Sequence, residues 1–395
     1  MIAVGRGPTS WVEAWTTHGR RVVAIVTLVS AAACSGSSDG SGELASATTV
    51  SPDGQATSNG STLPPPSGAP DFGPRIAGPA SRPSGSTTPI TIAFAGDSYG
   101  EGLSGDVAAG MIGRLSPMAP VLSAADLAVL NLETAITERG EPVPKSFTFR
   151  APASILDGIA SSGVDAVSVA NNHGMDYGEV GLMDSLDARI DSPIPVVGVG
   201  IDEAEALSPA RFTVEGTSVA VIGATQVLDD SVLESWTATP DHAGLASAKR
   251  VEELEEAVEE ARADADVVIV FLHWGIETET CPSETQTDLA DTLAAAGATA
   301  VVGGHAHRLQ AGGFLGSTYV HYGLGNFAFN ARSEASAKTG VLTLTFAGGR
   351  VTDEQWTPGE IRDSSPYPLE GDDAARAVDE WESLRGCAGL AATPG

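Results

Sequence analysis

Six side chains of types that bind divalent metal ions stand where apolar runs of the sequence end. They are two carboxylates, one amide and three imidazoles: Asp97, Glu133, Asn172, His273, His305 and His307. Imidazole and carboxylate ligands without a thiolate suit Zn, Mn or Fe better than a soft metal. In open α/β sheets, ligand sites gather at the carboxyl ends of strands. The spacing therefore predicts one site for one or two divalent ions, with a carboxylate bridging them where there are two.

The runs that precede these side chains are short and apolar, which is typical of strands buried on both faces. Nine such runs occupy residues 91–97, 126–133, 166–173, 195–200, 218–226, 266–275, 300–307, 318–327 and 340–346. Helical periodicity appears between several of them, at 152–162, 245–263 and 283–296, and again at about 372–385. Strand–helix alternation predicts an α/β fold. The late, hairpin-like strands add a second sheet, so we expect a layered two-sheet sandwich flanked by helices.

The order of the motifs resembles one family. Along the chain stand Gly96-Asp97, Asn131-Leu132-Glu133, Ala170-Asn171-Asn172-His173, Asp176-Tyr177-Gly178, His273-Trp274-Gly275, Gly304-His305-Ala306-His307 and Gly325-Asn326-Phe327. This set, from about residue 91 to about residue 330, resembles the CapA family of poly-γ-glutamate capsule synthesis. The resemblance implies the metallo-dependent phosphatase (calcineurin-like) fold.

The resemblance also implies how the ligands are shared. Asp97 and His307 would hold a first ion, and Glu133 would bridge it to a second. The second ion would take the three remaining ligands: Asn172, His273 and His305.

One departure from the wider superfamily bears on the first ion. Ordinary phosphoesterases begin with Asp-x-His, whereas this chain has Asp97-Ser98-Tyr99. The first ion therefore lacks an imidazole. It would bind weakly, be completed by water or Glu101, or be absent, which puts ordinary two-metal phosphodiester hydrolysis in doubt.

Other residues are expected to act on a substrate. By the resemblance, His173 would be the general acid that protonates the leaving group, with Asp176 supporting it. Lys145 and Arg150 are rare cations in an acidic chain and are candidates to bind an anionic substrate; the alternative is that they are ordinary surface charges. Glu277 is a further candidate, with surface charge the alternative.

The N-terminal region reads as an export and anchoring segment. Arg20-Arg21 precedes a short apolar run that ends Ala31-Ala32-Ala33-Cys34, which resembles a bacterial lipobox. We expect a lipoprotein signal peptide over 1–33 and a lipidated Cys34. A Gly/Ser/Thr/Pro-rich tether would extend over 34–88, and a folded domain would occupy 89–395. The expected location is the extracytoplasmic face of the cell membrane.

Two further cysteines, Cys281 and Cys387, lie in the folded part. Exported proteins meet oxidising surroundings, where two thiols tend to bond if geometry permits. We expect a Cys281–Cys387 disulfide that ties the C-terminal helix to the loop after His273. The alternative is two free thiols.

The formal net charge of −30 excludes nucleic acid as a partner, because so acidic a surface repels a phosphate backbone. The residues and the resemblance together favour a metal-dependent hydrolase or transferase that acts on an anionic envelope polymer. Two alternatives stay open. One is a non-catalytic accessory subunit of a membrane capsule-synthesis complex, and the other is a metal-dependent phosphoesterase.

Overall fold

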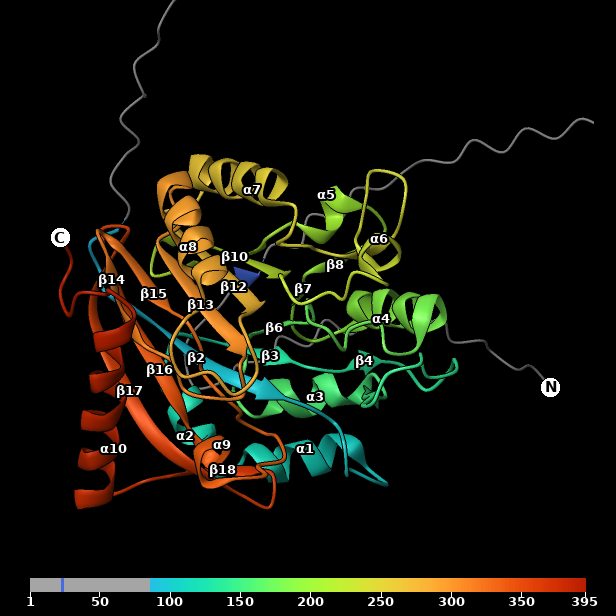
Figure 1. Cartoon of the computed structure of the whole chain (residues 1–395), viewed down its shortest axis with the longest axis horizontal. Helices are drawn as coiled ribbons and strands as arrows, with labels where there is room; N and C mark the ends of the chain where they lie inside the picture. Colours follow the sequence, from blue (N-terminus) through green and yellow to red (C-terminus); the bar gives the residue numbers. More distant parts are fainter. Residues whose placement is uncertain (1–22, 25–85) are drawn as a thin grey trace, which may run out of the picture. The chain divides into compact units, whose positions relative to one another are not determined.

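The computed structural model describes residues 23–24 and 86–395 (Figure 1). The expected lipidation site at Cys34 and almost all of the expected signal peptide and tether lie outside the described residues. Within the described part of the chain, no helix is long and apolar enough to cross a membrane.

The first of two seven-stranded sheets contains Asp97. Its strand order is β18 (Ser365–Pro368), β17 (Arg350–Arg362), β16 (Lys338–Ala347), β2 (Ile90–Ser98), β3 (Leu127–Leu132), β6 (Ala166–Ser168) and β7 (Val196–Val197). Strands β2, β3, β6 and β7 run parallel, so their carboxyl ends meet at one edge. The late strands β16, β17 and β18 extend this sheet in antiparallel fashion.

The second sheet carries the histidines. Its order is β1 (Val23–Ala24), β9 (Ala210–Val214), β10 (Thr217–Thr225), β12 (Val267–Trp274), β13 (Ala300–His305), β15 (Thr318–His321) and β14 (Gly312–Leu315). Strands β10, β12, β13 and β15 are parallel, and the register places His273 opposite Gly304. Two short pairs complete the strands: β4 (Ala135–Ile136) with β5 (Arg150–Ala151), and β8 (Val199–Gly200) with β11 (Gly244–Leu245).

The two sheets pack face to face through one buried apolar cluster. Ile92 and Phe94 of β2 enter it from the first sheet, and Ile269 and Phe271 of β12 enter it from the second. Because side chains alternate along a strand, the residues between them point to the outer faces. The predicted two-sheet sandwich is confirmed.

Helices cover both outer faces, as predicted. On the first sheet α1 (Val107–Leu115) and α3 (Ser154–Ser161) pack on Ala93 and Ala95, and on the second α7 (Val251–Asp264) and α8 (Glu284–Ala296) pack on Val268 and Val270. The side chain of Ser283 and that of Gln286 form the capping box of α8, and Gly297 ends the helix at φ +103°. The other helices are α2 (Ala119–Leu122), α4 (Gly178–Asp191), α5 (Glu203–Ala206), α6 (Leu233–Trp236), α9 (Glu334–Ala337), α10 (Gly371–Ser383) and the 3₁₀ helix η1 (Leu384–Cys387).

Several expected strands are shorter than their apolar runs: 166–173 forms a strand only to Ser168, and 195–200 divides between β7 and β8. The run 318–327 forms a strand only to His321, and the rest crosses from one sheet to the other. The amide of Leu324 donates to the carbonyl of Gly303 in the second sheet, and the amide of Phe327 donates to the carbonyl of Asp97 in the first. Its apolar side chains are buried because this crossing runs through the interior, not because they lie in a strand.

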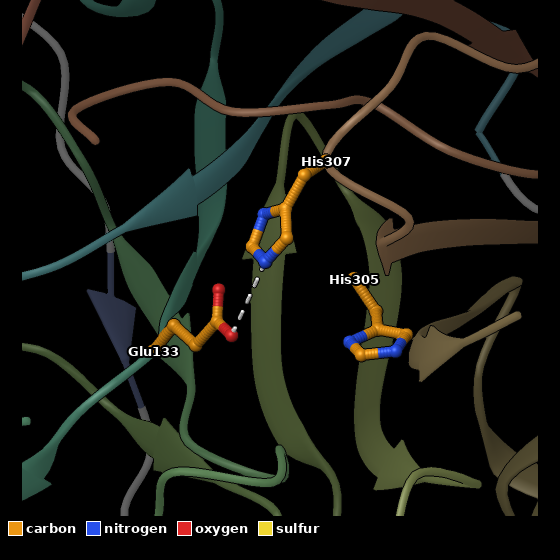
Figure 2. Close-up of side chains that lie close together, drawn as sticks. All are labelled: Glu133, His305 and His307. Atoms are coloured by element: carbon orange, nitrogen blue, oxygen red, sulfur yellow. Dashed lines mark ion pairs between the residues drawn. The ribbon is translucent and has the colours of Figure 1, made fainter. Parts of the chain in front are cut away.

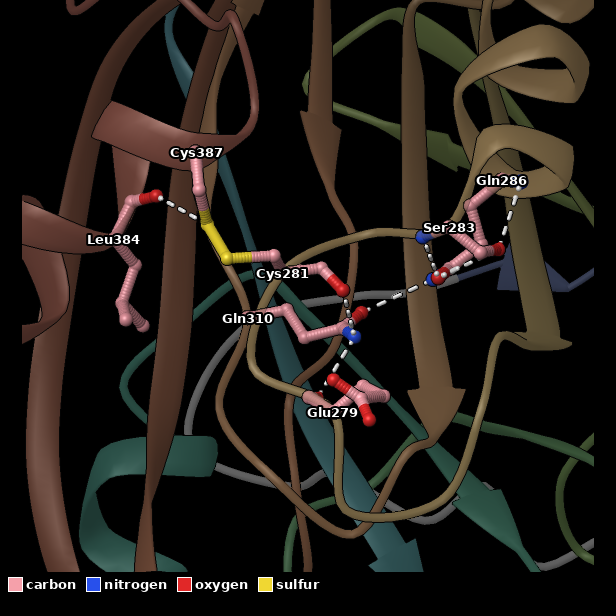
Figure 3. Close-up of a disulfide and its surroundings, with 7 residues drawn as sticks. All are labelled: Glu279, Cys281, Ser283, Gln286, Gln310, Leu384 and Cys387. Atoms are coloured by element: carbon pink, nitrogen blue, oxygen red, sulfur yellow. Dashed lines mark hydrogen bonds between the residues drawn. A yellow bond between two sulfur atoms is a disulfide. The ribbon is translucent and has the colours of Figure 1, made fainter.

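A disulfide joins Cys281 to Cys387, with their Cα atoms 5.7 Å apart (Figure 3). It ties η1 to the loop that follows β12. The buried side chain of Gln310 holds the same loop, since its Nε2 donates to the carbonyl of Glu279 at 3.0 Å (Figure 3). Earlier in the same loop, the amide of Thr278 donates to the carbonyl of Ala306 at 2.8 Å. Ala306 lies between the two histidines His305 and His307.

We predict that the variant Cys387→Ser is less stable than the native chain. In the chain-entropy model, a bridge spanning 106 residues contributes about 4–5 kcal/mol to the free energy of unfolding. Chemical denaturation measures this loss, and adding a reductant to the native chain reproduces it. Equal stability of the native and variant chains under non-reducing conditions would contradict the prediction.

Candidate metal centre

The six expected ligands stand at the adjoining carboxyl ends of the two sheets. Asp97 is the penultimate residue of β2, and Glu133 directly follows β3. His273 is the penultimate residue of β12, and His305 ends β13. Asn172 lies in the segment after β6, and His307 lies two residues beyond His305.

Three of these side chains form the tightest cluster, which we term the triad: Glu133, His305 and His307 (Figure 2). One ligand atom from each lies within 4.8 Å of the other two. Among the described residues, neither carboxylate oxygen of Glu133 nor Nδ1 of His305 has a hydrogen-bond partner, although both side chains are buried. Buried polar atoms are nearly always paired. These orphaned atoms therefore fit a bound cation.

A tight backbone turn presents the two histidines of the triad. His305 and His307 both adopt the left-handed region, at φ +89° and +51°. Such values are uncommon for residues other than glycine, and they cluster at functional sites. Gly304 precedes the turn, and a Cβ at this position would lie 2.4 Å from Oδ1 of Asp97. Glycine is thus required for the close approach of the two strands.

Asp97 is fully buried and hydrogen-bonded. Its Oδ1 accepts from Nδ2 of Asn131 at 2.8 Å, and its Oδ2 accepts from the amide of His305 at 3.0 Å. Nδ1 of His307 lies 3.3 Å from the same Oδ2. Asp97 therefore lies beside the triad and also orients the turn that contains His305 and His307.

His273 and Asn172 lie against the triad and contact each other. Nε2 of His273 is 2.8 Å from Oδ1 of Asn172 and 3.7 Å from Oε1 of Glu133. The imidazole centroids of His273 and His305 are 4.8 Å apart. The structure thus brings all six expected ligands together.

Burial and neighbouring charges shift the pKa values of all three triad residues. Burial, reinforced by Asp97, raises the pKa of Glu133 well above its usual range. Burial also lowers the pKa of His305 to about 3, with His307 adding to the effect. Burial acts against the charged form of His307, but the carboxylates of Glu133 and Asp97 outweigh it and raise the pKa of His307 to about 10. A divalent cation would supply the positive charge that Glu133 lacks.

The expected general acid faces the triad from the first sheet. Nδ1 of His173 lies 2.5 Å from Oδ2 of Asp176, and Nε2 lies 3.6 Å from Oε1 of Glu133. Asp176 thus fixes the ring so that Nε2 points to the centre. Burial lowers the pKa of His173, and the hydrogen bond and charge of Asp176 oppose that effect.

The three candidate substrate-binding residues occupy different environments. Lys145 lies inside the site, where Nζ donates to Oδ1 of Asp176 at 2.7 Å and to the carbonyl of Asn172. Arg150 is exposed, and its guanidinium lies over the ring of Tyr177, 4.7 Å from the centroid. Glu277 is exposed on the loop after β12, close enough to raise the pKa of Glu133.

Tyr99, at the position where ordinary phosphoesterases have a histidine, packs among aromatic side chains. Its ring stacks on Phe329, with centroids 3.9 Å apart. Burial raises the pKa of its hydroxyl. Glu101, the expected substitute, is exposed. Tyr99 therefore does not replace the missing imidazole.

Three asparagines belong to the motifs named in the sequence but were assigned no chemical role there. Asn131, Asn171 and Asn326 are buried and hydrogen-bond to the ligand residues or their neighbours. Each lies within two residues of a ligand or in a glycine-flanked motif at a strand end. Their positions in the sequence indicated that they lie near the site. Only the fold shows which residues their amide groups contact.

Comparison with known proteins defines the class. Residues 91–331 match the family described as bacterial capsule synthesis protein PGA_cap. Because this match covers more than half of the chain, the chain belongs to that family.

Two relatives illustrate the membership. The PGA biosynthesis protein CapA of Bacillus subtilis is 28% identical over 259 residues, which cover 64% of this chain and 66% of the relative. The capsule biosynthesis protein CapA of Bacillus anthracis is 27% identical over 228 residues, which cover 57% and 54%. The chain therefore spans less than two thirds of either relative.

Among solved structures, the 5′-nucleotidase of Candida albicans is similar at 13% identity, with a TM-score of 0.39. The similarity covers 75% of this chain and 57% of that one.

We predict that divalent metal stabilises the chain through the triad. A ligand that binds only the folded state stabilises it by about 2.7 kcal/mol at 100 times its Kd. Thermal unfolding of chelator-treated protein with and without added Zn²⁺ should show an upward shift of several degrees. The variant His305→Ala should lose this shift.

The matched control is His242→Ala, which removes a partly buried histidine outside the six expected ligands. It should retain the response to Zn²⁺. A shift of native size in His305→Ala would place the ion elsewhere.

Proposed function

We propose that this chain is a cell-envelope protein of capsule synthesis or processing, and a metal-dependent hydrolase or transferase acting on an anionic polymer. The observation that carries the proposal is the unpartnered carboxylate of Glu133 beside Nδ1 of His305, with His173 directed at the same point. Family membership supports the capsule context. The names of the Bacillus relatives point to poly-γ-glutamate as the polymer.

The residues present fit a divalent ion of the Zn, Mn or Fe type, held by imidazole and carboxylate. When bound, such an ion polarises a carbonyl or phosphoryl oxygen and makes water a better nucleophile at neutral pH. Nε2 of His173 faces the same point as the triad, where the protonated form of the ring would deliver a proton to the leaving group. Asp176 orients the His173 ring through Nδ1.

Lys145 adds a cation to this site, and its ammonium group is hydrogen-bonded to residues of the site. Its Nζ holds Asp176 and the carbonyl of Asn172, and it is 3.5 Å from Nδ1 of His173. Part of the side chain is still exposed, at 22%. It therefore combines two roles: it fixes the His173–Asp176 pair and favours an anionic group nearby.

A non-catalytic accessory subunit is the second candidate. Tyr99 supports it, because this side chain stands where ordinary phosphoesterases have a ligand histidine, and its ring stacks on Phe329. The same feature disfavours an ordinary two-metal phosphoesterase. The hydrolase or transferase and the accessory subunit would share this fold, and only the first would turn over a substrate.

The test uses the purified full chain loaded with Zn²⁺, Mn²⁺ or Fe²⁺ in turn. γ-Linked glutamate oligomers are the substrate, and p-nitrophenyl phosphate is the probe for phosphoesterase activity. We expect release of shorter oligomers and little phosphate. No turnover of the oligomer with any of the three metals would favour the accessory subunit.

We predict that His173→Ala abolishes this turnover and leaves the metal content unchanged. The imidazole transfers a proton and is not a ligand, so its removal lowers kcat by about 10²–10⁴. Activity assays and metal analysis on the same preparation check both parts. Native turnover in His173→Ala would remove the assigned role.

We also propose that the protein is exported and anchored at the extracytoplasmic face through a lipidated Cys34. The short apolar run that ends at this cysteine supports the proposal. Expressed in a bacterial host, Cys34→Ala should move from the membrane fraction to a soluble extracytoplasmic fraction. Its retention on membranes would show that the anchor is elsewhere.

A further inference from the structure

Hydrogen bonds divide the six expected ligands into two groups. Glu133 and His305 keep unpartnered atoms, as described above, and Nε2 of His307 lies 4.0 Å from Oε1 of Glu133. Asp97, Asn172 and His273 instead have their polar atoms engaged with protein groups. The direction of each hydrogen bond shows which histidines can bind a metal ion.

The orientation of the buried amides follows from backbone groups. Nδ2 of Asn171 donates to the carbonyl of Leu132 at 2.9 Å, and Oδ1 of Asn171 accepts from the amide of His173 at 3.0 Å. Since backbone groups cannot exchange donor and acceptor roles, these contacts fix which atom of Asn171 is nitrogen. Its second N–H then donates to Oδ1 of Asn131 at 3.1 Å. The Nδ2 of Asn131 must therefore face the opposite side.

On that side, Nδ2 of Asn131 donates to Oδ1 of Asp97 and lies 3.2 Å from Nδ1 of His273. His273 must accept at Nδ1, so in its neutral form the proton is on Nε2. This Nε2–H then donates to Oδ1 of Asn172 at 2.8 Å. A metal-binding histidine does the opposite: it donates its second ring N–H to an acceptor. Neither ring nitrogen of His273 therefore has a lone pair available for a metal ion: Nδ1 accepts a hydrogen bond, and Nε2 carries the proton.

His307 has the polarity that a ligand needs. Nδ2 of Asn326 donates to the carbonyl of Ser336 at 3.1 Å, so its Oδ1 faces Nδ1 of His307 at 2.7 Å. Oδ2 of Asp97, a second acceptor, lies 3.3 Å from the same Nδ1. In the neutral form of His307, the form that can bind a metal ion, the proton is thus on Nδ1, and the lone pair of Nε2 is directed toward Glu133 (Figure 2).

We infer that the site binds a single divalent ion through the triad, Glu133, His305 and His307. Asn172 and His273 are then positioning residues behind the ion, and Asp97 orients His307. This inference rests on the metal dependence proposed above and narrows it. Two imidazoles and one carboxylate leave coordination positions open, an arrangement used by zinc hydrolases and by iron(II) centres.

The test is metal stoichiometry. The full chain is treated with chelator, given an excess of ZnCl₂, freed of unbound ion by gel filtration, and analysed by mass spectrometry for zinc. We expect about one ion per native chain. Glu133→Gln and His307→Ala should retain almost none.

Asn172→Ala is the matched control, because Asn172 is partly exposed and its loss leaves no large cavity. At equilibrium with saturating free Zn²⁺, measured by dialysis in place of gel filtration, it should still bind one ion, with an affinity reduced by about 10- to 100-fold, as is typical for a residue behind the ligands. X-ray absorption at the zinc edge should show two imidazoles per ion. Circular dichroism of each variant checks that it is folded.

The possible outcomes distinguish a failure of the single-ion site from a failure of the proposed function. Two ions per native chain, three imidazoles per ion, or loss of zinc from folded Asn172→Ala would each overturn the single-ion site. No bound zinc in the native chain would overturn both this inference and the proposed metal dependence. One ion without turnover of the oligomer would support the single-ion site and contradict only the proposed catalysis.

Discussion

The carboxylate of Glu133 is the constraint on which the rest of the site depends. It is fully buried, and none of the described residues donates a hydrogen bond to it. Burying such a charge costs several kcal/mol, and the nearby cations of His307 and Lys145 offset only part of that cost, because the pKa of Glu133 stays well above its usual range. Protonation would remove the charge but leave the oxygens unpaired. A bound divalent cation removes the cost, and it explains why the imidazoles of His305 and His307 face the same point.

Both sheets contribute residues to the site around Glu133. The first sheet contributes Asp97 and Glu133, the second contributes the histidines, and the segment 322–327 links them by hydrogen bonds to both. Outside the sheets, the disulfide and the amide of Thr278 hold the loop that reaches the histidine turn. Position in such a site is set by backbone contacts, so exposed residues nearby can vary without moving the ligands.

The sequence predicted the sandwich and the convergence of the ligands because both follow from local patterns. Buried parallel strands have a distinct apolar signature, and polar residues at their ends must meet at one edge. The crossing at 322–327 was not predictable, since an apolar run reads alike in a strand and in a buried connection. Nor could the sequence show that His273 accepts a hydrogen bond at Nδ1. That depends on Asn131 and Asn171, whose orientation only tertiary contacts determine.

The most direct measurement of the central claim is anomalous diffraction from crystals of the chain grown with Zn²⁺, recorded at the zinc absorption edge. We predict a strong peak within bonding distance of the Glu133 carboxylate, Nδ1 of His305 and Nε2 of His307, at about 2.0–2.2 Å. Ordered crystals with no anomalous peak among these three side chains, or with hydrogen-bond donors from the protein filling that space, would contradict it.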